Sequence, residues 1–119
     1  MSILPDAVLD WRYNSGVQIS LADAKHESNC ISELMDAQGM THCKLLIDVR
    51  EIGSISRRAR QYFASKGVHD VFGVQGLALI IGSPIGTMVG NLYFSLNRTH
   101  HPTRLFSERE PALTWLRGL

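Results

Sequence analysis

A short apolar run near the middle of the chain, residues 44–49, has the sequence Lys-Leu-Leu-Ile-Asp-Val. Its length and nearly continuous hydrophobicity are typical of a strand that is covered on both faces, as in parallel sheets. Ser56 follows after a short loop and predicts a helix that runs to Lys66 and stops at Gly67, because a serine hydroxyl caps free backbone N–H groups. A strand, a loop and a helix in this order indicate an α/β domain.

Upstream of this run, the sequence predicts a hairpin and then a helix. Residues 7–13 alternate apolar and polar side chains, and residues 17–21 resume the alternation after a turn-forming Asn-Ser-Gly. We therefore expect these two segments to pair with each other as an amino-terminal β-hairpin. Asp23 is expected to cap a helix with apolar positions three and four residues apart, and Gly39 is expected to end it.

Downstream, residues 75–81 predict a second buried strand. Ser83 and Pro84 mark the start of a helix, since proline is accommodated in the first turn, and the apolar residues of 85–96 recur at helical spacing. Residues 71–97 contain no charged side chain, a length that would allow a membrane-spanning helix. The glycines and the Ser-Pro pair inside the segment favour a buried strand followed by a buried helix, so we expect no membrane span.

The carboxy-terminal part completes the predicted order of elements. Residues 103–106 predict a short strand, and Ser107 with Glu110 predicts a capping box for a last helix. The resulting order is β-β-α-β-α-β-α-β-α. It implies right-handed crossovers between mostly parallel strands, with helices packed against the sheet.

Length and composition fit one globular domain over residues 1–119. The chain is 45% hydrophobic and 19% charged, and it is long enough to bury a core without disulfides or a structural metal. Its formal net charge of +1 gives no electrostatic reason to expect nucleic acid as a partner. The start of the chain has no signal-peptide pattern. We therefore expect a cytoplasmic protein in which Cys30 and Cys43 are reduced and packed in the core.

Several segments resemble bacterial SpoIIAA-like, STAS-type domains, from about Val8 onward. The resembling segments are residues 46–49 (Leu-Ile-Asp-Val), 57–63 (Arg-Arg-Ala-Arg-Gln-Tyr-Phe), 77–86 (Leu-Ala-Leu-Ile-Ile-Gly-Ser-Pro-Ile-Gly), 102–107 (Pro-Thr-Arg-Leu-Phe-Ser) and 112–116 (Ala-Leu-Thr-Trp-Leu). The resemblance implies an anti-sigma-factor-antagonist fold, a class that acts mainly by docking other proteins rather than by catalysis.

The resemblance also implies where a partner would dock. In the best-understood members of this class, a serine begins the helix after the central strand, and its phosphorylation blocks docking. Ser56, with Ser54 nearby, occupies the matching place here. The usual Asp-Ser-Ser-Gly of the class is replaced by Ser54-Ile55-Ser56-Arg57, so the resemblance implies the fold more directly than it implies the phosphorylation.

The helix start at Ser56 is the first candidate site. Free backbone N–H groups and the nearby Arg57, Arg58 and Arg60 suit an anion, a phosphate or a phosphoserine at Ser56. The alternative is a plain N-cap followed by a solvated basic helix face.

The second candidate site is the helix that begins at Pro84. Its glycines are four residues apart and would let a ligand or a second copy of the chain approach closely, with Phe94 off the core stripe. Tight packing of helix against sheet is the alternative. The segment lacks a Walker loop and a nucleophile elbow. The candidate residues are Gly82, Ser83, Gly86, Gly90 and Phe94.

Metal and catalytic sites are not predicted. A basic cluster before the last strand has no Cys, Asp or Glu at ligand-like spacing beside it, so we interpret it as a solvated loop. Its members are Arg98, His100, His101 and Arg104. The remaining histidines are His26, His42 and His69, and they are isolated in sequence. Only the spatial arrangement could support a Ser/His/Asp set that uses Asp48.

The sequence therefore favours a non-catalytic STAS-like regulatory domain that binds a protein partner or forms a homodimer, without a cofactor. The second hypothesis is a carrier for a small apolar or anionic ligand, lipid-like or nucleotide-like, between the sheet and the glycine-bearing helix. The third hypothesis is a hydrolase or a transferase, which needs polar groups that converge in a cleft.

Overall fold

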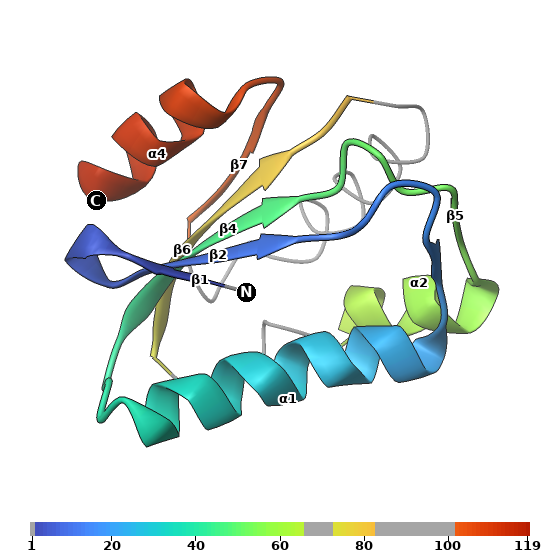
Figure 1. The fold of residues 1–119 in the computed structure, drawn as a ribbon, viewed down its shortest axis with the longest axis horizontal. Coiled ribbons are helices and arrows are strands. Elements are labelled where there is room, and N and C mark those ends of the chain that lie inside the picture. Colours follow the sequence, from blue (N-terminus) through green and yellow to red (C-terminus); the bar gives the residue numbers. More distant parts are fainter. Residues whose placement is uncertain (1, 66–72, 83–101) are drawn as a thin grey trace.

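A five-stranded sheet in the spatial order β1-β2-β4-β6-β7 forms the centre of the fold (Figure 1). The structure, a computed structural model, describes residues 2–65, 73–82 and 102–119. The strands are β1 (Ser2–Leu4), β2 (Val8–Arg12), β4 (Cys43–Asp48), β6 (Val74–Ile80) and β7 (Thr103–Phe106). β2, β4, β6 and β7 pair in parallel, and β1 pairs antiparallel to β2. The predicted α/β class with a mostly parallel sheet is confirmed.

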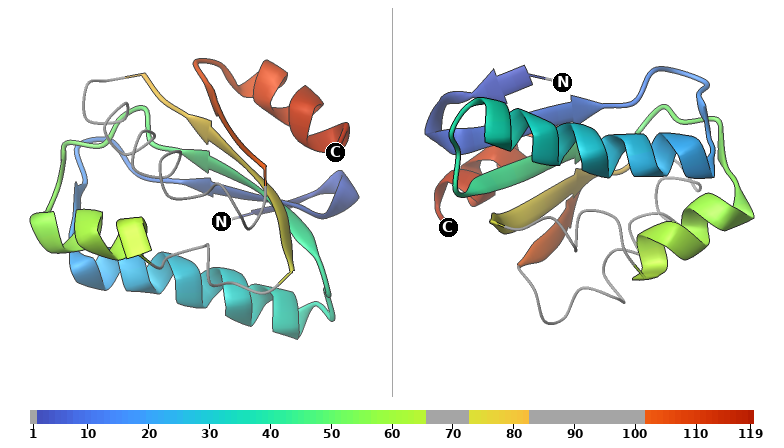
Figure 2. Two further views of the ribbon diagram at one scale, coloured as in Figure 1. Left: turned by 180° about the vertical axis from the view of Figure 1, so that it is seen from behind. Right: turned by 90° about the horizontal axis from the view of Figure 1, so that it is seen from below.

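Helices lie on both sides of this sheet. α1 (Leu21–Ala37) and α2 (Arg57–Ser65) lie on one side, and α4 (Arg109–Arg117) lies on the other, as the turned views show (Figure 2). Among the described residues, no helix is long and apolar enough to cross a membrane. The helix expected from Pro84 lies outside the described residues.

The two faces of the sheet bury two separate clusters. Leu9, Leu45 and Leu77 belong to the cluster under α1 and α2, whereas Val8 and Leu46 pack with α4. Since successive side chains of a strand point to opposite faces, Asp10 and Arg12 of β2, and Asp48 of β4, share the α4 face. The central run predicted at residues 44–49 is confirmed as β4, which is paired on both sides.

The predicted pairing of residues 7–13 with residues 17–21 is wrong, and a different hairpin begins the chain. β1 pairs with β2 through the 3-10 turn η1 (Pro5–Ala7), in which Asp6 and Ala7 have φ values of 66° and 58°. The expected partner segment instead contains β3 (Gln18–Ile19), which pairs in parallel with β5 (Ser54–Ile55). After β2 the chain stays beside β4, since the Tyr13 N–H donates to the Asp48 carbonyl at 3.1 Å, so it cannot fold back on β2.

The helix ends follow the predicted residues in part. α1 is capped by Ser20, and Asp23 completes the capping box as its third residue rather than capping the helix itself. Gly39, with φ of 63°, lies just past the end of α1, as predicted. The capping box predicted at Ser107 is wrong, because α4 begins one residue later, after Glu108, with no side-chain cap.

Candidate functional site

The first turn of α2 is the predicted candidate site, and Ser56 caps it as expected. The Ser56 hydroxyl accepts a hydrogen bond from the Ala59 N–H at 3.1 Å. The backbone N–H of Ser56 donates to the Ile19 carbonyl at 2.9 Å, which attaches the start of the helix to β3. Ala59 is fully buried, so the apolar side of the turn is fixed against the core while Ser56 stays exposed.

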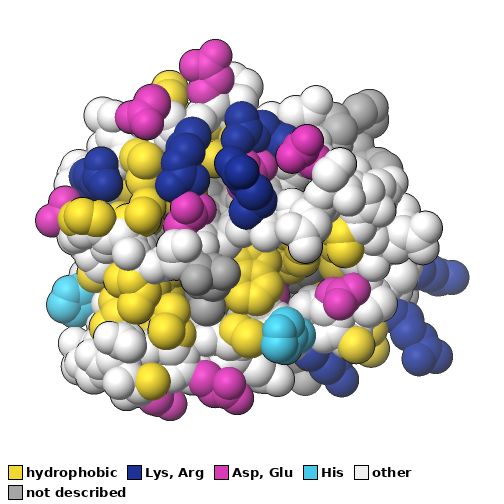
Figure 3. All heavy atoms as spheres, viewed as in Figure 1, with side chains coloured by type: hydrophobic (Ala, Val, Ile, Leu, Met, Phe, Trp, Pro, Cys, Tyr) yellow, Lys and Arg dark blue, Asp and Glu magenta, His cyan; other side chains and the backbone are white. Residues whose placement is uncertain are grey.

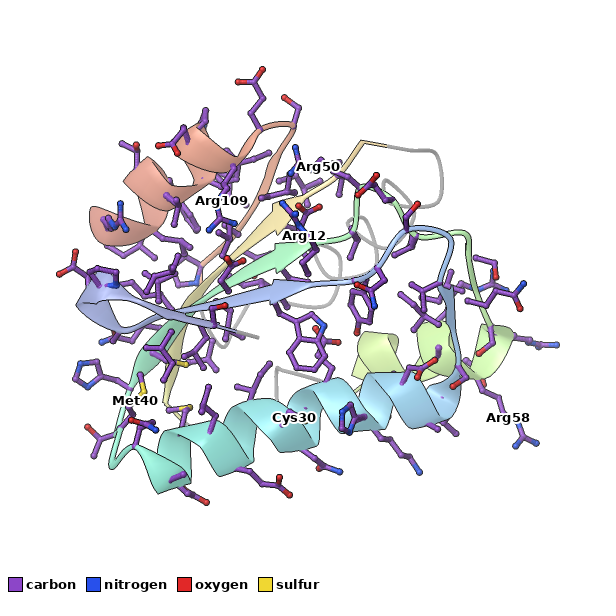
Figure 4. All side chains as sticks on the ribbon, viewed as in Figure 1. Arg12, Cys30, Met40, Arg50, Arg58 and Arg109 are labelled. Atoms are coloured by element: carbon purple, nitrogen blue, oxygen red, sulfur yellow. The ribbon has the colours of Figure 1, made fainter. Side chains whose placement is uncertain are left out.

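Two of the predicted arginines project from this turn into solvent. Arg57 and Arg58 are exposed, and among the described residues neither forms an ion pair. Arg58 points away from the body of the molecule (Figure 4). Arg60 is half-buried, and Ser54 is half-buried in β5, paired with Gln18. Ser56, Arg57 and Arg58 therefore form one exposed polar surface, which we call the α2 surface.

The second predicted site lies mostly beyond what the structure describes. Gly82 is exposed just after β6. A side-chain carbon at this position would lie 3.2 Å from the Cγ of Arg50, so the glycine leaves room for the arginine side chain. Ser83, Gly86, Gly90 and Phe94 lie outside the described residues, as do Arg98, His100, His101 and His69.

A set of charges that the sequence analysis did not predict lies at the carboxyl end of β4. Asp48 is buried and accepts hydrogen bonds from the Arg50 N–H at 3.0 Å, from its Nε at 3.1 Å and from a terminal nitrogen at 2.7 Å. The Nε of Arg12 lies 3.3 Å from the same carboxylate. Burial by itself would raise the pKa of Asp48, but the hydrogen bonds from Arg50 and the charges of Arg50 and Arg12 outweigh it and lower the pKa.

A second carboxylate on the same face links the two ends of the chain. Both terminal nitrogens of Arg109, the first residue of α4, donate to Asp10 of β2, at 3.1 and 2.7 Å. Beside this pair is a pocket of about 380 Å³. Its lining residues are Ser2, Asp10, Arg12 and Arg109. We call it the arginine pocket. An aspartate inside the apolar run of β4 and alternating charges on β2 were the signals for it in the sequence.

The Ser/His/Asp arrangement considered for Asp48 is not formed by the described residues. The hydrogen bonds of Asp48 come from arginine, and no described histidine or serine bonds to it. In a catalytic triad the aspartate orients a histidine base. Asp48 instead is held in its ionised form by two guanidinium groups and orients their side chains.

The opposite face of the sheet holds a buried pair of acidic groups under α1. The Tyr13 hydroxyl donates to the Glu27 carboxylate at 2.8 Å, and Glu27 is fully buried. Burial, and then the neighbouring negative charge of Glu27, raise the pKa of Tyr13. The rings of Trp11 and Tyr13 pack in an edge-on arrangement, with centroids 6.0 Å apart. This polar pair lies inside the core cluster and was not predicted.

The two cysteines have different environments. Cys43 is fully buried beside the Met35 sulfur at 3.5 Å, as predicted, and burial raises its pKa to about 11. Cys30 is half-buried, and its sulfur lies 3.3 Å from the Nε2 of His26, so its predicted core position is wrong. Over residues 2–65, 73–82 and 102–119, no group of three or more His, Cys, Asp or Glu side chains could hold a metal ion.

Comparison with known proteins shows the family and the fold. Residues 1–119 match the model of the family described as Domain of unknown function (DUF7793), and the chain belongs to that family. It is also similar to the crystal structure of an uncharacterized protein from the DUF3478 family with a SpoIIAA-like fold, from Shewanella loihica PV-4. The two share 15% sequence identity over 98% of this chain and 89% of that chain, with a TM-score of 0.68. No curated protein matches the sequence. The likeness confirms the predicted SpoIIAA-like fold.

Proposed function

We propose that this chain, as a DUF7793 member with a SpoIIAA-like fold, is a non-catalytic cytoplasmic module that docks a protein partner through the α2 surface. The partner presents an acidic patch there. Docking is the mode of action that the resemblance to anti-sigma-factor antagonists implies, and the α2 surface includes Ser56, the residue that the resemblance matches to their docking serine.

The observation that carries this proposal is the exposed pair of arginines in the first turn of α2. Arg57 and Arg58 are held in place by a helix that Ser56 caps and Ala59 anchors. Within the described part of the chain no carboxylate neutralises them. Exposed charges without a local counter-ion raise the association rate and the specificity for a surface of opposite charge.

Phosphorylation of Ser56 would regulate the same surface. A phosphate carries close to two negative charges at neutral pH, and the amino end of a helix tolerates negative charge. The fold would therefore accept the modification. The phosphate would neutralise Arg57 and Arg58 and repel an acidic partner, so we expect phosphorylation to release the partner.

The experiment uses site-specific photo-crosslinking in the cells from which the protein comes. A photoreactive amino acid replaces Arg57, and in a control protein it replaces Glu33, which is exposed on α1. We expect one partner protein to cross-link from position 57 and not from position 33. Cross-links to a second copy of the chain, or to the same proteins from both positions, would contradict the proposal.

The identified partner is then purified and its affinity is measured by calorimetry. We expect Arg58→Glu to weaken binding by about tenfold, because a reversed charge faces the acidic patch. The matched control Lys25→Glu changes an exposed residue of α1 and should leave the affinity unchanged. An equal loss of affinity in both variants would show that only the net charge of the protein matters, and it would exclude the α2 surface as the docking site.

Ser56→Asp separates docking from folding. Aspartate is a good helix cap, so this variant should unfold at nearly the same urea concentration as the parent protein. We expect it to bind the partner more weakly than Ser56→Ala does, although Ser56→Ala loses about 1 kcal/mol of stability with the cap. If Ser56→Asp binds the partner as tightly as the parent protein does, the proposed regulation by phosphorylation is wrong.

A further inference from the structure

The arginine pocket lies on the α4 face of the sheet, away from the α2 surface. Arg12, Arg50 and Arg109 approach this region from three separate parts of the chain (Figure 4), and basic side chains gather there on the surface (Figure 3). We propose that the arginine pocket binds the oxyanion group of a small molecule, a carboxylate or a phosphate, with Arg12 as the binding residue and Arg109, which is already paired with Asp10, as a second positive charge beside it. This inference does not depend on the proposed docking function.

The position of the pocket in the sheet favours a ligand. Its residue Arg12 ends the parallel strand β2 and stands opposite Asp48 at the end of β4, whereas Ser2 and Asp10 place the rest of the pocket over β1 and β2. Ligands of open α/β sheets bind outside the carboxyl ends of the strands. α4 buries the other part of this face, through residues such as Leu116 against Leu46, and leaves the charged part open.

The terminal nitrogens of the Arg12 guanidinium are the hydrogen-bond donors that a ligand would contact. Its Nε faces Asp48, and within the described residues its two terminal nitrogens have no hydrogen-bond partner. Its side chain is 57% exposed. The contact with Asp48 orients the planar guanidinium, whose terminal nitrogens match the two oxygens of a carboxylate or a phosphate.

A purely structural role accounts for Arg50 but not for Arg12. The backbone N–H and the guanidinium of Arg50 already satisfy Asp48. Arg12 adds a single 3.3 Å contact. An arginine that is largely exposed contributes little to stability through one such contact, which leaves its terminal nitrogens available for recognition.

Charge and size define the class of ligand. The lining residues hold two guanidinium groups and one carboxylate, which leaves one positive charge in excess. The charges of Asp48 and Arg50, which lie behind these residues, cancel each other. The exposed Glu51 and Glu108 interact with Arg50, and the exposed Glu110 interacts with Arg109, but none of the three lines the pocket. A volume of about 380 Å³ lies near the lower end of the range for small-molecule sites, so we expect a small ligand with one anionic group.

The test is a titration of the isotope-labelled protein followed by the amide signals in NMR spectra. The probes are inorganic phosphate and acetate, each at constant ionic strength set with sodium chloride. We expect one probe to cause saturable shifts at residues 10–12 and 109–110, with a Kd of about 1 mM, as befits a single anionic group. Preference for phosphate or for acetate identifies which of the two anions the natural ligand carries.

Two arginine variants distinguish the pocket from general basicity. Arg12→Gln should weaken binding by about tenfold, because it removes a charge-assisted pair of donors. It should also keep the parent spectrum elsewhere, since Arg50 still holds Asp48. Arg58→Gln makes the same change on α2 and should leave the Kd unchanged.

Each other result overturns the inference. Shifts that do not saturate, shifts confined to the start of α2, or equal affinity in Arg12→Gln would show that the arginine pocket binds no anion. Arg12→Lys keeps the charge and removes the planar group, so it should bind more weakly than the parent protein. If Arg12→Lys binds as well as the parent, the proposed geometry is wrong.

Discussion

Asp48 shows at the scale of single residues how one buried charge organises its surroundings. It ends a strand whose other charged residue is Lys44, and its side chain is 5% exposed, where an unpaired carboxylate would be strongly unfavourable. Arg50 follows two residues later and donates from both backbone and side chain, while Arg12 approaches from the neighbouring strand. The buried Asp48 carboxylate is therefore stabilised by two arginines, and it in turn holds their side chains in place.

We expect Asp48→Asn to lower the free energy of unfolding by about 2 kcal/mol at neutral pH, because it leaves Arg50 and Arg12 without their counter-charge. The pKa of Asp48 is lower in the folded protein than in the unfolded chain, so its stabilisation is present above the unfolded value of about 3.9. It is lost as the pH falls through the folded pKa.

Urea unfolding of both proteins at neutral pH and at a pH well below the ordinary aspartate value measures this effect. The difference between parent and variant should shrink on acidification. Asp36→Asn is the matched control, because Asp36 is exposed on α1, and it should change the stability little at either pH. A difference that stays constant with pH would show that the charge of Asp48 is not what stabilises the fold.

Local sequence patterns at the scale of elements predict the ends of α1 better than the partner of β2. Ser20, Asp23 and Gly39 act within a few residues of the helix they delimit. The strand partner instead depends on contacts with distant residues, since the Tyr13 N–H donates to the Asp48 carbonyl at 3.1 Å and the Gly16 N–H donates to the Glu51 carbonyl at 2.8 Å. A period of two in residues 17–21 indicates a strand, but it contains no information on which strand it joins.

Gly39→Ala tests the end of α1. Gly39 has φ of 63° and nothing within 4 Å of the position that a Cβ would take, so the substitution changes the backbone energy alone. We expect a loss of about 1 kcal/mol in the free energy of unfolding, since the left-handed region is unfavourable for alanine. Gln38→Ala, with φ of −95°, should cost much less in the same urea titration. Equal costs would mean that the backbone conformation at residue 39 is not needed.

The whole molecule brings together residues that no local pattern connects. Arg109 and Asp10 are separated by 99 positions in the chain, and they meet because β2 lies two strands from β6 while α4 packs back over β4 and β6. The elements on either side of this contact were predictable, because each has its own hydrophobic period. The charges of the arginine pocket are visible in the sequence, but their meeting was not predictable, because it requires the register of β2 against β4 and the placement of α4 at the same time.

The covering of the second sheet face by α4 makes the last helix essential to the stability of the whole fold. Leu116 is fully buried against the face that includes Val8 and Leu46. We expect Leu116→Ala to lower the free energy of unfolding by about 3 kcal/mol, through lost burial and the cavity that remains. Leu119→Ala removes the same atoms from a residue that is 47% exposed and should cost far less. Hydrogen exchange of the β4 and β6 amides in Leu116→Ala should accelerate together with global unfolding. Faster exchange in α4 alone would instead show that the helix detaches as a separate unit and that the sheet is stable without it.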